Sequence, residues 1–99
     1  MSQGAIHRVA GGASLLCRVQ TEFGRDIPTV LCAPVAPLAD WGPAAPRLHI
    51  VFPLDGVPHV IVMTQLVAVS TTDLGPAIGD ASDRRDEIVA AVDLLVSGF

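Results

Sequence analysis

The sequence contains no lysine, and its six arginines stand against ten acidic residues, which leaves the 99-residue chain with a net charge of −4. Apart from the pair Arg84 and Arg85, the arginines are scattered and form no basic stripe. Proteins that bind nucleic acid directly neutralise phosphates with clustered cationic side chains. We therefore predict that the protein has no direct nucleic-acid partner.

Long apolar runs are also missing. No stretch approaches the length that crosses a bilayer, and residues 1–10 carry no apolar signal core. The two cysteines, Cys17 and Cys32, are spaced as neither a zinc site nor a redox motif requires. These absences predict no membrane partner, a cytoplasmic location, and two buried free thiols in a reducing compartment.

Recognisable catalytic machinery is absent as well: there is no glycine-rich phosphate loop and no nucleophile elbow. His7 lies near an N-terminus that we expect to be loose. His49 and His59 lie on opposite arms of a predicted hairpin but not opposite each other, so they do not share a metal ion. The acidic residues within 80–87 fit a solvated helix start better than acid–base catalysis. We expect no metal, no cofactor, no catalytic residue, and a protein that is not an enzyme.

What the chain does contain is apolar: 51% of its residues are hydrophobic and only 16% are charged. This balance is the reverse of that in disordered chains, and the length suits one domain covering residues 1–99. A small domain with so much apolar material often covers part of it with a partner.

Short strands account for most of the chain. Alternating or continuous apolar runs predict strands at residues 14–20, 29–33, 48–52, 59–63 and 66–69. Asp55-Gly56 between two of these runs predicts a tight hairpin, because both turn positions favour positive φ. Residues 34–46 contain four prolines, so we predict a loop that cannot belong to a central strand. Trp41 in this loop is either a plug over the core or an exposed contact, and residues 70–79 are predicted to be irregular.

A helix is predicted to begin near Ser82, with Ser82 or Asp83 as its cap and two acidic residues in its first turn. Apolar residues recur at helical spacing on one face, namely Ile88, Ala91, Val92 and Leu95. The opposite face is also apolar, at Val89, Ala90 and Leu94, and is interrupted only by Asp93. Such a helix is typically buried on more than one side, and in a domain this small another chain is expected to cover the second side. Gly98 ends the helix.

The order and spacing of several segments resemble the CcdB toxin family. The segments are Leu54-Asp55-Gly56, Met63-Thr64, Leu66-Val67-Ala68-Val69, Leu74-Gly75, Arg85-Asp86-Glu87-Ile88, Ala91, and Asp93-Leu94-Leu95-Val96-Ser97-Gly98-Phe99. Upstream, Val19-Gln20 and Ala33-Pro34 lie at similar distances, so the resemblance spans nearly the whole chain.

The resemblance implies a mainly β fold, an SH3-like barrel built from an antiparallel sheet with one C-terminal α-helix, assembled as a homodimer. It also implies the toxin of a type II toxin–antitoxin module, with roles in plasmid maintenance and transcription repression. Family toxins insert their C-terminal tails into the A subunit of DNA gyrase, trap its complex with cleaved DNA, and are neutralised by a cognate CcdA-like antitoxin. By this resemblance the gyrase-binding residues are Phe23, Gly24, Asp93, Val96, Ser97, Gly98 and Phe99.

One departure keeps two alternatives open. Ser97 stands where the best-known family member has a tryptophan, and a buried aromatic anchor of that kind contributes roughly 2–4 kcal/mol to an interface. The chain is alternatively a diverged toxin fold that has lost gyrase activity and serves as an antitoxin-bound corepressor. A MazF-like mRNA endoribonuclease is the other alternative, but it needs a cationic RNA groove that this acidic chain does not suggest.

Overall fold

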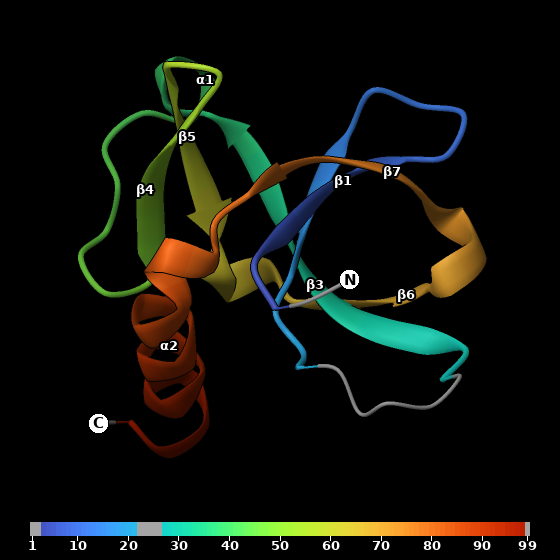
Figure 1. The fold of residues 1–99 in the computed structure, drawn as a ribbon. Helices are drawn as coiled ribbons and strands as arrows, with labels where there is room; N and C mark the ends of the chain where they lie inside the picture. Colours follow the sequence, from blue (N-terminus) through green and yellow to red (C-terminus); the bar gives the residue numbers. More distant parts are fainter. Residues whose placement is uncertain (1–2, 22–26, 99) are drawn as a thin grey trace.

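The computed structural model describes residues 3–21 and 27–98, and within them seven strands form one antiparallel sheet (Figure 1). The strands are β1 Ala5–Val9, β2 Leu15–Arg18, β3 Thr29–Pro37, β4 His49–Leu54, β5 Val57–Val62, β6 Val67–Ser70 and β7 Leu74–Asp80. The helices are α1 Leu38–Trp41 and α2 Arg85–Ser97, with short 3₁₀ turns at Met63–Gln65, Thr71–Asp73 and Ser82–Arg84. The strands follow the order β4-β5-β3-β2-β1-β7, and β6 pairs with the first half of β3, on the same side as β5. This confirms the predicted fold class, a mainly β, SH3-like barrel with a C-terminal helix.

The hairpin of β4 and β5 agrees with its prediction in detail. Asp55 and Gly56 have φ angles of 51° and 76°, as the tight turn requires. The register pairs His49 with Val62 and Phe52 with His59, so the two histidines are not cross-strand partners. The predicted strands at 14–20 and 66–69 are also present, as β2 and β6.

The central strand β3 contradicts the prediction that residues 34–46 are entirely loop. β3 runs through Pro34 and lies inside the sheet, paired with β2 on one side and with β5 and β6 on the other. Leu31 directs its backbone N–H and C=O at the residues that follow β2. Because these directions alternate along a strand, Pro34, three positions further on, directs its backbone nitrogen and its C=O toward the opposite side. There the pairing with β6 ends at Cys32 and the pairing with β5 begins at Val35. The missing N–H of Pro34 therefore removes no ladder hydrogen bond.

Two further predictions, for the N-terminal segment and for residues 70–79, are also wrong. The N-terminus is not loose from residue 5 on, because β1 lies between β2 and β7, and His7 is only 2% exposed. The segment 70–79 is not irregular, since most of it forms β7. Two register shifts interrupt the pairing of β1 with β7, and a Cβ at Gly75 would lie 2.6 Å from the Arg8 carbonyl oxygen. Only a glycine lets the two backbones approach so closely here.

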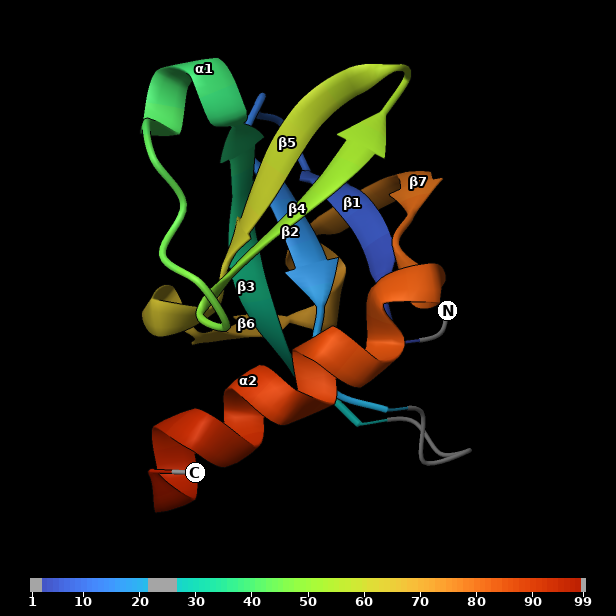
Figure 2. The same ribbon diagram turned by 90° about the vertical axis from the view of Figure 1, so that its left-hand side faces the viewer.

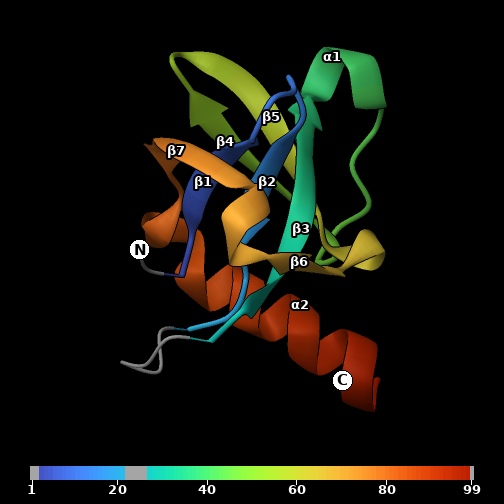
Figure 3. The ribbon, with the colours of Figure 1, turned by 90° about the vertical axis from the view of Figure 1, so that its right-hand side faces the viewer.

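Two apolar clusters stabilise the fold. The larger cluster lies between the sheet and α2, which crosses beneath the strands (Figure 2). Its members include Ile6, Phe52, Ile61, Met63, Ile88 and Ala91. The smaller cluster, Leu16, Val30 and Cys32, lies on the other face of β2 and β3 and is partly covered from β6 and β7 (Figure 3). None of the helices within the described residues is long and apolar enough to cross a membrane.

Candidate functional site

The end of α2 carries the residues that the resemblance assigns to partner binding. Gly98 adopts a left-handed conformation, with a φ of 78°, and its N–H donates to the carbonyl of Leu94 at 2.9 Å. This is the usual way in which a glycine closes a helix. The Ser97 hydroxyl donates to the Asp93 carbonyl at 2.6 Å, so its polar group is already satisfied within the helix. The last turn is therefore a well-formed helix end.

Exposure along α2 divides the helix into two halves. Ile88 and Ala91 are completely buried, whereas Leu95 is 42% exposed and Val96 is 81% exposed. Figure 2 shows why: the first half of α2 lies against the sheet, and the second half projects past it. The prediction that Leu95 shares the buried face with Ile88 is therefore wrong, because the sheet ends before the helix does.

The side of α2 opposite the sheet is exposed in this single chain. Val89 is 44% exposed and Ala90 is also exposed, while Leu94 is half-buried. The expectation that the helix is buried on more than one side is thus not met within one chain. An apolar helix side without a cover in the described chain is available to a partner.

The predicted site residues divide into those that the structure describes and those that it does not. It brings Asp93, Val96, Ser97 and Gly98 together at the end of α2. Asp93, Val96 and Ser97 are all exposed there. Phe23, Gly24 and Phe99 lie outside the described residues, so their relation to this helix end stays a prediction.

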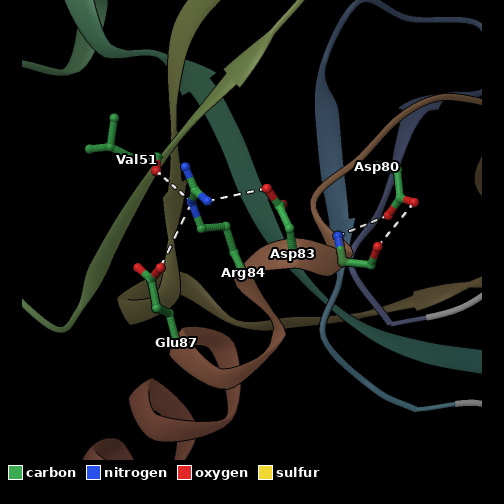
Figure 4. Close-up of polar contacts among 6 residues, drawn as sticks. Val51, Asp80, Asp83, Arg84 and Glu87 are labelled. Atoms are coloured by element: carbon green, nitrogen blue, oxygen red, sulfur yellow. Dashed lines mark hydrogen bonds and ion pairs between the residues drawn. The ribbon is translucent and has the colours of Figure 1, made fainter.

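The start of α2 is built differently from its prediction. A 3₁₀ turn, Ser82–Arg84, precedes the helix, and neither Ser82 nor Asp83 caps it. Instead the Asp80 carboxylate accepts hydrogen bonds from the Ser82 N–H at 2.9 Å and from the Ser82 hydroxyl at 3.1 Å (Figure 4). The carboxylate at the end of β7 thus stabilises the turn that leads into the helix.

Arg84 joins this helix start to the edge strand β4 (Figure 4). Its Nε–H donates to the Val51 carbonyl at 3.3 Å and lies 3.8 Å from a Glu87 carboxylate oxygen, and its Nη1–H donates to Asp83 at 3.2 Å. Sequence reasoning noted Arg84 only as part of an arginine pair. No local signal could reveal its role, because Val51 is 33 positions away in the chain.

The three histidines lie in separate environments. The Nδ1–H of His7 donates to the Gly75 carbonyl at 3.0 Å, and that of His59 donates to the Val57 carbonyl at 2.8 Å. In His49 the Nδ1 atom instead accepts the Ala45 N–H at 2.9 Å. Nothing in the part of the chain that the structure describes groups three His, Cys, Asp or Glu side chains as a metal ion requires.

Trp41 lies at the surface. It is 36% exposed and meets the His49 ring edge-on, with the ring centres 5.2 Å apart, so it is a surface contact and not a plug over the core.

Cys17 and Cys32 are buried free thiols, as predicted. Burial raises the pKa of Cys17 to about 12, with smaller contributions from Cys32 and Asp80. Burial also raises the pKa of Cys32, against an opposing effect of Arg18. Both groups are therefore inert as nucleophiles at neutral pH.

Comparisons with known proteins agree with this architecture. The sequence profile of a family described as CcdB protein matches residues 5–98. No curated protein sequence matches the chain. One similar solved structure is described as an endoribonuclease in complex with its cognate antitoxin from Mycobacterial species, with a TM-score of 0.73 and 14% identity over 94% of this chain and 91% of that one. Another is a crystal structure of an Mtb toxin, with a TM-score of 0.62 and 15% identity over 95% of this chain and 99% of that one. At these identities the likeness establishes the fold.

Proposed function

Because this chain belongs to the CcdB family of toxins from toxin–antitoxin systems, we propose that it poisons DNA gyrase by binding and not by catalysing a reaction. Its C-terminal tail binds the gyrase A subunit and traps the enzyme in its complex with cleaved DNA. The observation that carries this proposal is the 81% exposure of Val96 on a helix end that projects beyond the sheet.

The geometry of the helix end suits insertion into another protein. Leu95 and Val96 expose apolar side chains, while the Gly98 N–H and the Ser97 hydroxyl are hydrogen-bonded within the helix. Polar groups that are already hydrogen-bonded add little to the cost of burying such a segment in a protein interface. Phe99, which follows Gly98, adds an aromatic ring of the kind that dominates interface energies.

A homodimer is the second part of the proposal. Val89 and Ala90 leave a short apolar strip on the side of α2 that faces away from the sheet, with the exposed Asp93 next to it, and this strip is free within the described chain. Pairing of two copies through this strip covers it and presents two tails. Light scattering at micromolar concentration is expected to show a dimer, and Val89→Asp is expected to shift it to the monomer. A wild-type monomer under these conditions would exclude this arrangement.

The third part concerns a CcdA-like antitoxin, which we propose neutralises the toxin with a segment that is disordered when free. The protein offers exposed apolar side chains on several elements, including Trp41, Val57 and Val67. A segment that folds on binding can follow such a dispersed surface. The antitoxin is expected to bind the tail-deleted toxin as well as the full chain.

The gyrase proposal is tested by calorimetry against a gyrase A fragment. Deletion of residues 97–99 and Val96→Ser should each weaken binding, while circular dichroism confirms folding. Val57→Ser is the matched control, since Val57 is also exposed but lies at the hairpin of β4 and β5. Ser97→Trp should tighten binding by about tenfold or more. A folded toxin that binds antitoxin but not gyrase would support the corepressor alternative instead.

An endoribonuclease is the second candidate, because one similar fold belongs to a protein described in those words. RNA cleavage needs accessible acid–base groups. His7 and His59 are only 2% and 9% exposed, which leaves His49 as the more accessible imidazole. We expect no RNA cleavage by the wild type. Specific cleavage that disappears in a folded His49→Ala, His59→Ala variant would replace the gyrase proposal.

A further inference from the structure

Arg84 occupies the junction between the sheet and α2. Its guanidinium contacts three acceptors at once: the Val51 carbonyl of β4, the Asp83 carboxylate just before it, and the Glu87 carboxylate one turn into the helix. Only 31% of its side chain is exposed, against 71% for Asp83. The planar fork of an arginine can serve several acceptors at fixed angles, which a lysine ammonium on a flexible stem does not.

Few buried residues within α2 itself set its direction, and just before the helix the buried Ala81 donates its N–H to the Gly4 carbonyl at 2.7 Å. Ile88 and Ala91 are the only fully buried residues of α2, and both lie in the first half of the helix. Val92 and Leu94 are half-buried, and the turn that follows is exposed. Apolar contacts keep the helix on the sheet, but they are not directional. The hydrogen bond from Arg84 to Val51 is a directional contact across the junction, and the ion pairs with Asp83 and Glu87, which belong to the same turn of the chain, hold the guanidinium in place.

A small change in the angle of α2 at this junction produces a large displacement of the C-terminal tail. The 13 residues of α2 span roughly 20 Å, so a turn of about 10° at the start of the helix displaces its end by roughly 3 Å. A displacement of that size exceeds the tolerance of a well-packed interface, whose density matches that of protein interiors. The direction of α2 therefore decides whether the tail meets its partner.

We propose that Arg84 is a positioning residue, which sets the direction of α2 by anchoring the helix start to the edge of β4 and so aims the tail at its partner. This inference rests on the proposed binding function of the tail. The neighbouring Arg85 carries the same charge and is exposed, and it makes no hydrogen bond or ion pair among the described residues. The pair thus provides a matched test.

The direction of the helix can be measured without any partner. Trp41 is the only tryptophan and ends α1, and α1 lies at the opposite end of the molecule from the end of α2 (Figure 2). A fluorescent acceptor on Ser97→Cys reports the distance to it by energy transfer, and the buried native cysteines should not react. An excess of unlabelled Trp41→Phe chains keeps the signal within one chain. We expect Arg84→Ala to change and broaden the distance distribution, Arg84→Lys to do so less, and Arg85→Ala to leave it unchanged.

Binding to the gyrase A fragment is then measured for the same substitutions in chains that retain Ser97. Arg84→Ala should weaken binding roughly tenfold through a slower association of the misdirected tail, with unchanged helix content by circular dichroism. Arg85→Ala should bind as the wild type does. An unaltered distance distribution in Arg84→Ala overturns the positioning role. A loss of gyrase affinity in Arg84→Lys equal to that in Arg84→Ala overturns it as well. So does wild-type affinity in Arg84→Ala. If the wild type itself does not bind gyrase, the proposed function fails, while the energy-transfer result still decides the role of Arg84.

Discussion

Replacing Ile88 by alanine tests how α2 is held against the sheet. Ile88 is completely buried in the larger apolar cluster, and the substitution removes three carbon atoms. Their transfer to water costs about 2.4 kcal/mol, and the cavity left behind raises the loss to about 3–4 kcal/mol. The gain in helix propensity on changing to alanine returns only about 0.4 kcal/mol. The free energy of unfolding should therefore fall by about 3 kcal/mol.

Leu95→Ala provides the matched control, because it removes the same number of carbons from the same helix. Leu95 is 42% exposed, so only part of the transfer cost applies and no closed cavity forms. The expected loss is about 1 kcal/mol. The two variants should then differ by about 2 kcal/mol, or roughly 10 °C in the melting temperature of a domain of this size.

Thermal and urea unfolding at low protein concentration measure both variants. Dilution matters because a dimer that covers Leu95 would add to the cost of its substitution, and that addition should vanish on dilution. Equal losses for the two variants in dilute solution would refute the division of α2 into a packed half and a projecting half. Equal losses only at high concentration would place Leu95 in the dimer contact.

Three further outcomes are expected. The raised pKa of Cys17, about 12, means that between pH 9 and 12 the folded chain keeps a proton that the unfolded chain releases, so the free energy of unfolding should fall by up to about 1.4 kcal/mol per pH unit. Cys17→Ala should flatten this slope in urea titrations, and an equally steep slope in the variant would contradict the assignment. Asp80→Ala should lower stability by about 1 kcal/mol, because the Ser82 N–H and hydroxyl lose their acceptor; no change in the melting temperature would show that the turn does not depend on that carboxylate. His49→Ala should alter the fluorescence of Trp41, which loses its edge-on ring, and an unchanged emission spectrum would argue against that contact.

Local signals account for the parts of the fold that sequence reasoning predicted correctly. Asp55-Gly56 specifies its hairpin within two residues, since the positive φ angles and the register both follow from the turn. The helical spacing of Ile88 and Ala91 likewise identified the helix and its buried centre. These features depend on neighbours in the sequence, so they can be read without the tertiary structure.

The errors arose where the outcome depends on distant segments. Pro34 is acceptable in a central strand only because its missing N–H faces the gap between the pairings with β6 and β5. The segment Leu74–Asp80 forms a strand because it pairs with β1, and Gly75 permits the close approach of the two backbones. Local composition describes neither relation, and turn-forming residues therefore suggested a loop in both places.

Residue types and their spacing were sufficient to predict the mainly β fold class, the hairpin, the buried thiols and the existence of the final helix, and the order of several segments was sufficient to reveal the resemblance to the family. Which part of that helix is packed and which part is free depends on the tertiary structure. Ala91 is the last residue of α2 that is buried, and Arg84 connects the start of the helix to β4. The periodicity of α2 continues past the surface that could bury it, so the same apolar spacing yields a buried Ile88 and an 81% exposed Val96.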